Sequence, residues 1–167
     1  MTEFSVAGVR ISRREVLGAI AAAVLINLIG ALGVPFTTPD SAWFQALEKP
    51  WFYPPGATFG IVWTLLFTLM GIAAYLVYRQ GTENRAVKLA LGVFAVQMVV
   101  NVAWSPTFFA AQELLLALGV IVVLWVLIVA TIAAFARVDR RAAALLVPYL
   151  AWVSFAAVLN YSIWALN

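Results

Sequence analysis

Five long apolar stretches separated by short polar breaks dominate the pattern of this chain. Each is close to the roughly 20 residues that a helix needs to cross a hydrocarbon core about 30 Å thick. Helices are expected because backbone polar groups in lipid must find partners within the protein, and the alternation typical of membrane β-strands is missing. The pattern predicts an all-α integral membrane bundle with spans at about 16–34, 59–78, 88–109, 114–135 and 142–166.

The longest polar break, residues 35–58, is expected to form an ordered lid over one end of the bundle. It carries aromatic side chains at Trp43, Phe44 and Trp51, and it holds five of the seven prolines. A connection of this length inside a compact domain is usually functional or disordered, and the aromatic residues favour an ordered structure. We therefore expect the mouth of a ligand site here.

A short helix is predicted within this lid, at about residues 39–47. Thr38 has the side chain of a helix N-cap, and Pro39 suits the first helical position because its missing N–H is not needed there. The helix is expected to end before Lys49, since a residue that precedes a proline, here Pro50, disfavours the helical conformation.

Composition narrows the classes of function. Hydrophobic residues make up 65% of the 167 positions and charged residues 10%, whereas soluble domains have about 45–50% and about 25%. The chain has no cysteine, which excludes thiolate chemistry, and no histidine, the commonest metal ligand. We expect a single membrane domain, residues 16–167, behind a basic N-terminus, residues 1–15, and no required cofactor or metal.

Nine of the ten basic residues fall in three segments that five spans would place on one side of the membrane: 1–15, 79–88 and 137–141. Lys49, in the lid, is the exception. The positive-inside rule then predicts a cytoplasmic N-terminus, with the lid and the C-terminus on the outer side. Nucleic acid is not an expected partner, because basic residues with interleaved aromatic residues form no stripe.

The N-terminal arginines have a second interpretation. Ser12, Arg13 and Arg14, followed by apolar residues, fit a twin-arginine export signal, with Ala21–Ala23 as a loose cleavage site. We favour the alternative, in which the arginines anchor a retained first span, because removing that span would disturb the consistent charge topology.

Three of the predicted spans carry polar or aromatic side chains along one face. Polar groups at bilayer depth are costly, so their positions indicate helix contacts or a ligand site. At about 100° per residue, each set falls on a narrow face of its helix. If the faces converge, they form an aromatic cavity with carboxamides beneath the lid. The sets are Trp63, Phe67, Met70 and Ala74; Gln97, Asn101, Trp104 and Phe108; and Tyr149, Trp152, Ala156 and Asn160.

Several of these residues have a structural alternative. The carboxamides of Gln97, Asn101 and Asn160 could bond across helices as packing contacts, which would not prevent them from lining a cavity. Trp164 fits an aromatic belt at the membrane interface better than a ligand site, and the lid tryptophans are further candidates for that belt. Trp125 lies in a span that is apolar all round, where packing is the favoured interpretation.

Three blocks of sequence carry a resemblance to a known family. They are Trp43-Phe44-Gln45-Ala46-Leu47-Glu48-Lys49-Pro50 with Pro54-Pro55 and Val62-Trp63; Gln97, Asn101 and Trp104-Ser105-Pro106-Thr107-Phe108-Phe109; and Pro148-Tyr149, Trp152, Phe155-Ala156 and Leu159-Asn160. In order and spacing the chain resembles the TspO/MBR family, which comprises tryptophan-rich sensory proteins and the translocator proteins, or peripheral-type benzodiazepine receptors. The resemblance extends from about residue 16 to residue 167.

The resemblance implies a five-helix bundle, often a homodimer, with a ligand cavity closed by the lid. Ligands of the family include porphyrins such as protoporphyrin IX and haem, sterols and synthetic drugs. Trp63 and Trp152 match a pair that some members are proposed to use in light-dependent porphyrin breakdown. Lys49 joins the candidate site as a partner for ligand carboxylates. Carried over by position, the other ligand-binding residues are Phe44, Pro50, Trp63, Phe67, Asn101, Trp104, Trp152, Ala156 and Asn160.

Two departures from the family pattern limit the expected ligands. Phe52 stands where the family has a tryptophan after Lys-Pro, and Tyr161 is not followed by the Lys or Arg of the sterol-recognition pattern. Sterol recognition by that motif is therefore unsupported. Strong axial ligation of haem iron is not expected without histidine or cysteine, so a metal-free porphyrin fits better.

Four functions are compared. The leading prediction is a membrane protein that binds a porphyrin, or another planar apolar molecule, as a sensor, regulator or transporter. An enzyme that degrades porphyrin in light through Trp63 and Trp152 is the first alternative. A carrier of lipid or isoprenoid with the same cavity is the second, and a scaffold without a ligand is the third. The enzyme requires both tryptophans, whereas a binder keeps much of its affinity without them.

Overall fold

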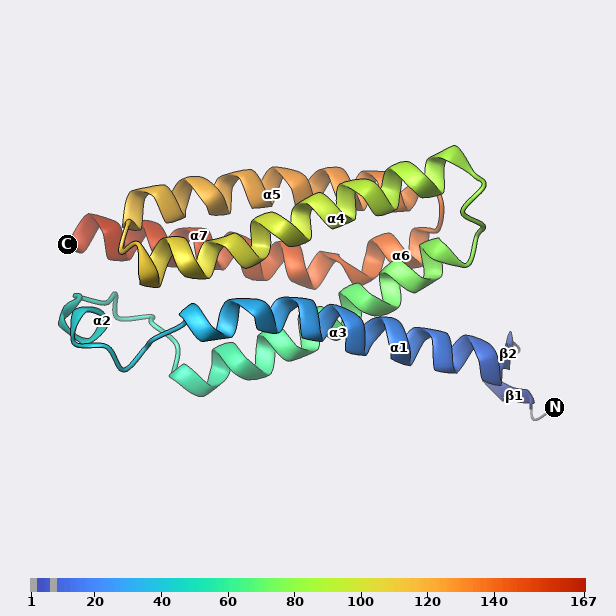
Figure 1. Cartoon of the computed structure of the whole chain (residues 1–167), viewed down its shortest axis with the longest axis horizontal. Helices are drawn as coiled ribbons and strands as arrows, with labels where there is room; N and C mark the ends of the chain where they lie inside the picture. Colours follow the sequence, from blue (N-terminus) through green and yellow to red (C-terminus); the bar gives the residue numbers. More distant parts are fainter. Residues whose placement is uncertain (1–2, 7–8) are drawn as a thin grey trace.

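The computed structural model describes the backbone of residues 3–6 and 9–167 and the side chains from residue 12 onward. Over this part of the chain, five helical segments are long and apolar enough to cross a membrane. They run along the long axis of the molecule (Figure 1). The prediction of an all-α integral membrane bundle with five spans is confirmed.

The observed spans begin within three residues of their predicted starts. The last span differs because it consists of two helices, with the helical structure interrupted at Leu146. Pro148 lies in the first turn of the second helix, where its missing N–H is not needed. The spans are α1 (Arg13–Gly30) with the 3-10 helix η1 (Ala31–Phe36); α3 (Gly56–Tyr78); α4 (Arg85–Ser105) with the π-helical turn η2 (Pro106–Ala110); α5 (Leu114–Ala136); and α6 (Arg140–Leu145) with α7 (Val147–Leu166).

A short antiparallel hairpin precedes the first span, and the hydrophobic pattern did not predict it. Its strands are β1 (Glu3–Val6) and β2 (Val9–Ser12). Ser12 then begins α1 with a capping box: its hydroxyl accepts from the backbone N–H of Glu15 at 3.3 Å, and the Glu15 carboxylate accepts from the backbone N–H of Ser12 at 2.9 Å.

The lid helix is shorter than predicted, and the predicted cap is wrong. α2 covers Ala42–Ala46, and its N-cap is Ser41, whose hydroxyl accepts from the backbone N–H of Phe44 at 3.3 Å. Thr38 does not cap the helix, and Pro39 lies in a turn before it. Phe44, in the middle of this helix, points into the bundle, where its side chain is 4% exposed.

The spans form two groups (Figure 1). In one, α1 packs chiefly against α3; in the other, α5 packs against α4 and α7. α6 contacts both α3 and α5 and so joins the groups at the end opposite the lid. Nearer the lid, α3 and α7 diverge, and the space between them is where the polar and aromatic faces meet.

α1 and α3 approach each other most closely at Gly71, where a Cβ atom would overlap the backbone of Ala23. A hydrogen bond from Asn27 Nδ2 to Thr68 Oγ1 at 3.1 Å adds a polar contact along the same seam. The two helices therefore behave as one packed pair, with a second helix group across the cavity.

A compact apolar cluster closes the bundle beneath the lid, and we call it the lid cluster. Phe44 lies in its centre, with ring centroids 5.2 Å from Phe109 and 6.2 Å from Phe108. Burial of these rings ties the lid to η2 and α7. The cluster consists of Phe44, Phe108, Phe109, Ala117, Leu159 and Ile163.

Candidate ligand cavity

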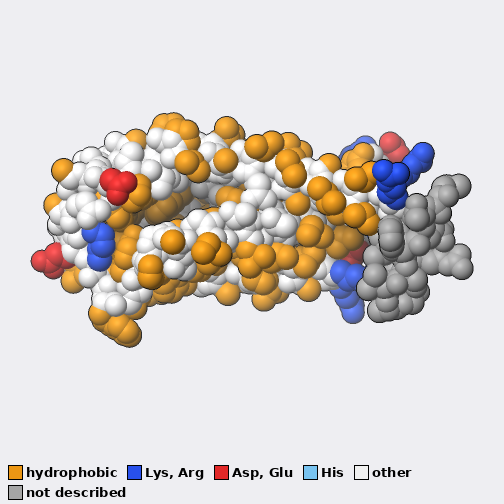
Figure 2. Space-filling model, turned by 90° about the horizontal axis from the view of Figure 1, so that it is seen from below, with side chains coloured by type: hydrophobic (Ala, Val, Ile, Leu, Met, Phe, Trp, Pro, Cys, Tyr) orange, Lys and Arg blue, Asp and Glu red, His pale blue; other side chains and the backbone are white. Residues whose placement is uncertain are grey.

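A cavity of about 1340 Å³ lies between the two helix groups. α1, α3, α4 and α7 supply its walls, and Phe44 and Tyr53 of the lid region reach it from above. Figure 2 shows that this face of the molecule is hollowed, with hydrophobic side chains along the rims. Most of the wall is therefore apolar.

The structure brings eight of the ten predicted ligand-binding residues to this cavity. Each of the three faces predicted from the sequence reaches this space with part of its residues. Met70, Ala74, Gln97 and Tyr149, the other members of those faces, are not among the lining residues. The eight are Phe44, Trp63, Phe67, Asn101, Trp104, Trp152, Ala156 and Asn160.

Lys49 and Pro50, the other two, are not among the lining residues. The ammonium group of Lys49 donates to the backbone carbonyls of Phe44 at 2.8 Å and Leu47 at 3.1 Å. It also lies 4.6 Å from the centroid of the Phe44 ring, a favourable cation–π distance. Lys49 therefore stabilises the fold of the lid and does not point its charge at the cavity.

Aromatic rings contact one another in a nearly continuous wall. Trp63 stacks on Phe67, with centroids 5.2 Å apart and planes inclined by 27°. Across the space, Trp152 meets Phe59 edge-on at 5.9 Å, and Trp104 lies 4.9 Å from Phe108. These contacts hold the indoles in defined orientations, which prepares their faces for a flat ligand.

A buried hydrogen-bonded chain fixes the carboxamide of Asn101. Its Nδ2 donates to the hydroxyl of Tyr149 at 2.8 Å, and this hydroxyl donates to Oε1 of Gln97 at 2.9 Å. Gln97 and Tyr149 are each 1% exposed, so the chain lies in the core. The result is that the Asn101 carboxamide is held from behind, with Oδ1 as the atom that this chain leaves unused.

Asn160 has a different role, because both ends of its carboxamide are used within the protein. Oδ1 accepts from the indole N–H of Trp104 at 3.1 Å, and Nδ2 donates to the carbonyl of Leu114 at 2.9 Å. The residue therefore links α4, α5 and α7 while it lines the cavity. Asn101 and Asn160 therefore both make the packing contacts across helices that the sequence allowed as an alternative, and both also line the cavity.

Two buried donors have no hydrogen-bond partner within the described part of the chain: Nε2 of Gln97 and Nε1 of Trp152. Leaving such a donor unpaired costs about 1–3 kcal/mol, and unpaired groups of this kind need an explanation. Trp152 belongs to the cavity wall, so its indole N–H lies close to where a ligand acceptor would be.

The lid is fastened to the end of α7 by a reciprocal pair of hydrogen bonds. The backbone N–H of Glu48 donates to Oδ1 of Asn167, and Nδ2 of Asn167 donates to the carbonyl of Glu48, both at 3.0 Å. Tyr53 closes the other side, and its partial burial raises the pKa of its hydroxyl, which stays neutral at physiological pH. These contacts thus hold the lid in a defined position against α7.

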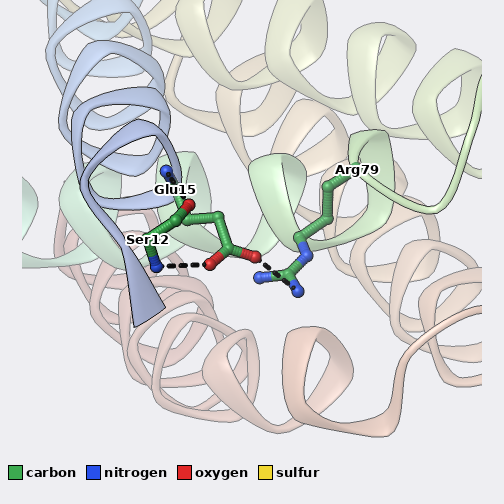
Figure 3. A network of polar contacts seen from close by, with 3 residues as sticks. All are labelled: Ser12, Glu15 and Arg79. Carbon is green, nitrogen blue, oxygen red and sulfur yellow. Dashed lines mark hydrogen bonds and ion pairs between the residues drawn. The ribbon is translucent and has the colours of Figure 1, made fainter. Parts of the chain in front are cut away.

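Sequence reasoning missed the far end of the cavity. The lining continues along α1 and α3 to Glu15, Arg79 and Arg141. Glu15 and Arg79 form an ion pair of 2.8 Å between α1 and the end of α3 (Figure 3). Asn27 and Thr68 also line the cavity, and a polar residue in an otherwise apolar span was the signal that could have revealed them.

The remaining tryptophans lie outside the cavity. Trp125 donates to Ser154 Oγ at 2.9 Å and so joins α5 to α7, in agreement with the packing role predicted for it. Trp51 is 95% exposed at the tip of the lid. Trp43 packs edge-on against Phe108 at 5.9 Å.

Comparison with known proteins finds relatives that match most of the chain. The chain is 41% identical over 140 residues to the tryptophan-rich protein TspO of Chlorobaculum tepidum, covering 83% of this chain and 89% of the relative. It is 39% identical over 138 residues to protein CrtK of Rhodobacter capsulatus, covering 83% and 85%. It is 35% identical over 140 residues to the translocator protein of Ovis aries, covering 83% of each.

The model of the TspO/MBR family matches residues 20–165, which include the five spans almost entirely. These matches cover the lid and the aromatic cavity as well as the helices. The chain is therefore a multi-pass integral membrane protein that belongs to the TspO/MBR family.

Proposed function

We propose that this protein binds a porphyrin, or a related planar tetrapyrrole, in the cavity beneath the lid. The observation that carries the proposal is the aromatic wall that three helices contribute: Trp63 from α3, Trp104 from α4 and Trp152 from α7. A flat aromatic macrocycle stacks on such rings. The cavity of about 1340 Å³ is larger than the roughly 300–1,000 Å³ of common small-molecule sites, so even a part of it has the size of a ligand site.

Polar groups in the wall favour a metal-free ligand. The carboxamide of Asn101 has its N–H group occupied by Tyr149, which leaves Oδ1 to accept from a pyrrole N–H. The unpaired indole N–H of Trp152 would donate to a ring nitrogen or carboxylate after a small rotation. The chain has neither histidine nor cysteine for strong axial ligation of haem iron.

The biological role we propose is sensing or transport of this ligand. Relatives carry the names tryptophan-rich sensory protein and translocator protein, and a lid fastened over the cavity suits either role. The basic segments support an orientation with the N-terminus in the cytoplasm and the lid outside. Ligand would then exchange at the outer side of the membrane.

Titration of the purified protein in detergent, followed by tryptophan fluorescence, tests the proposal. Protoporphyrin IX, haem and a sterol are each added to the unaltered protein and to Asn101→Ala. We expect saturable quenching by protoporphyrin IX, weakened about three- to tenfold in Asn101→Ala through loss of one hydrogen bond. Binding of haem should be weaker than that of the metal-free ring.

The same titration can overturn the proposal. If the sterol binds saturably while protoporphyrin IX does not, the protein is a carrier of another apolar ligand. If none of the three binds, the cavity is structural. Trp125→Phe is the matched control, because Trp125 lies outside the cavity lining and its loss should leave quenching by the ligand almost unchanged.

Light-dependent porphyrin breakdown is a second candidate, favoured by one observation: Trp63 and Trp152 line the same cavity. Loss of porphyrin absorbance under illumination, compared with a dark control, measures this activity. If the protein is an enzyme, Trp63→Phe combined with Trp152→Phe abolishes the loss while much of the binding persists, since phenyl rings also stack. A rate equal to that of free porphyrin in the same detergent rejects this candidate.

A further inference from the structure

The cavity is much longer than a porphyrin site needs. Helix rise places Arg79 about 24 Å from Trp63 along α3, and both residues line the cavity. A macrocycle held among Trp63, Trp104 and Trp152 occupies only the half nearer the lid. The other half ends at Glu15, Arg79 and Arg141, which we call the basic end.

The walls of this second half are apolar and face the membrane side of the molecule. α1 contributes Val16, Ile20 and Val24, which are 41–55% exposed. α3, which packs beside α1, contributes Ile72 and Leu76. Within a bilayer these side chains meet acyl chains. The stretch of α3 from Thr68 to Arg79 is about 17 Å long by helix rise, close to the roughly 15 Å that one leaflet contributes to the hydrocarbon core. One acyl chain fits along it.

The charge at the basic end is complementary to an anion. Both oxygens of the Glu15 carboxylate are engaged, one by the Arg79 guanidinium at 2.8 Å and the other by the backbone N–H of Ser12 at 2.9 Å (Figure 3). The contact with Glu15 uses Nη2 of Arg79, and a guanidinium has five N–H donors. Among the side chains that the structure describes, Glu15 is the one ion-pair partner of Arg79, so within this part of the chain its other donors are available for a second acceptor.

Arg141 adds a second guanidinium to the same cavity from α6, which packs against α3. Counting Glu15, Arg79 and Arg141 together leaves one net positive charge. Figure 2 shows that Lys and Arg side chains gather at this end of the molecule. Basic residues beside a span lie where lipid phosphates are, and guanidinium groups suit phosphate through paired N–H donors.

We propose that the half of the cavity at the basic end is a binding site for one anionic phospholipid. Its phosphate lies between Arg79 and Arg141, and an acyl chain lies along α1 and α3 toward Asn27 and Thr68. This site is distinct from the tetrapyrrole site and does not depend on it. Zwitterionic lipid binds more weakly, because it brings no net charge to balance the positive end.

Native mass spectrometry of the full-length protein tests the site, with phosphatidylglycerol or phosphatidylcholine added in detergent. The unaltered protein retains phosphatidylglycerol in preference to phosphatidylcholine. Arg79→Gln and Arg141→Gln each weaken phosphatidylglycerol binding about fivefold, the effect of one basic residue near a lipid surface. Arg85→Gln is the matched control, because Arg85 begins α4 outside the cavity lining and leaves binding unchanged.

Glu15→Gln separates a lipid site from a purely structural ion pair. It removes the carboxylate next to Arg79 and raises the net charge of the basic end by one, so phosphatidylglycerol binds at least as tightly as before. Loss of binding in this variant, with the protein still folded, would show that the pair only holds α1 to α3 and would overturn the proposal.

Two further outcomes also reject it. The first is equal retention of the two lipids, or an effect of Arg85→Gln as large as that of Arg79→Gln, which would indicate a general attraction by surface charge. The second is competition by glycerol phosphate, a headgroup without chains, at concentrations comparable to the lipid. That result would make the basic end a site for a free anion, and the apolar groove would play no part.

Discussion

At the scale of single residues, the site depends on a hydrogen-bonded chain that a list of polar positions does not reveal. Gln97, Tyr149 and Asn101 form a line in which each side chain orients the next. Asn160, at a similar depth, instead serves Trp104 and Leu114. The two asparagines therefore have different roles. Asn101 presents its side-chain oxygen to the cavity, and Asn160 links three helices.

Tyr149→Phe tests this chain. Removal of the hydroxyl leaves the Gln97 oxygen and the Asn101 amide without partners in the core, so we expect the free energy of unfolding to fall by about 1–3 kcal/mol. Thermal or denaturant unfolding in detergent measures the loss. Tyr161→Phe is the control, because Tyr161 is exposed on α7. Equal stability of the two variants would show that the chain contributes nothing.

Asn167→Ala tests the fastening of the lid. The variant removes both hydrogen bonds to Glu48, so backbone amides of the lid should exchange with solvent faster, and ligand should enter and leave faster. Hydrogen exchange read by mass spectrometry measures the first effect without any ligand. Ser162→Ala, which loses only a hydrogen bond to Val158 within α7, should leave the exchange of the lid amides unchanged. An equally large increase in exchange in Ser162→Ala would show that the Glu48–Asn167 hydrogen bonds do not fasten the lid.

At the scale of elements, α1 depends on α3 for its position. Gly71 allows their backbones to meet, and the Glu15–Arg79 pair joins their ends. The sequence predicted both spans but not this pairing, since Glu15 and Arg79 lie far apart in the chain and nothing local marks them as partners. The lid helix shows a similar limit: Ser41 and Thr38 both have side chains suited to an N-cap, and nothing local in the sequence indicates that Ser41 is the one used.

Two glycine substitutions test the contact between α1 and α3, because they should change the free energy of unfolding in opposite directions. Gly71→Ala places a methyl group against the backbone of Ala23, and overpacking of this kind costs about 1–3 kcal/mol. Gly92→Ala meets nothing within 4 Å and should stabilise α4 by up to about 1 kcal/mol. Unfolding measured in the same detergent compares them, and equal shifts would argue against a tight contact of α1 with α3.

At the scale of the whole molecule, most of the architecture follows from the sequence. Apolar length predicts the five spans, and helical periodicity predicts three faces, eight of whose twelve residues line one cavity. Periodicity also explains what was missed. It identifies which residues share a face but not which neighbours they contact. It does not apply to the lid loop, where Lys49 is assigned to the ligand from its charge although it bonds to backbone carbonyls of the lid. The break between α6 and α7 is likewise a matter of tertiary packing.

Filling the cavity is the most direct test of the central claim that a tetrapyrrole binds inside it. Ala156 lines the cavity, whereas Ala151, on the same helix, is exposed on the outer surface. In Ala156→Phe, titration with protoporphyrin IX should show an affinity at least tenfold weaker, which corresponds to about 1.4 kcal/mol of binding free energy. In Ala151→Phe, the affinity should be unchanged. If Ala156→Phe binds the porphyrin as tightly as the unaltered protein does, the ligand lies elsewhere and the account is wrong.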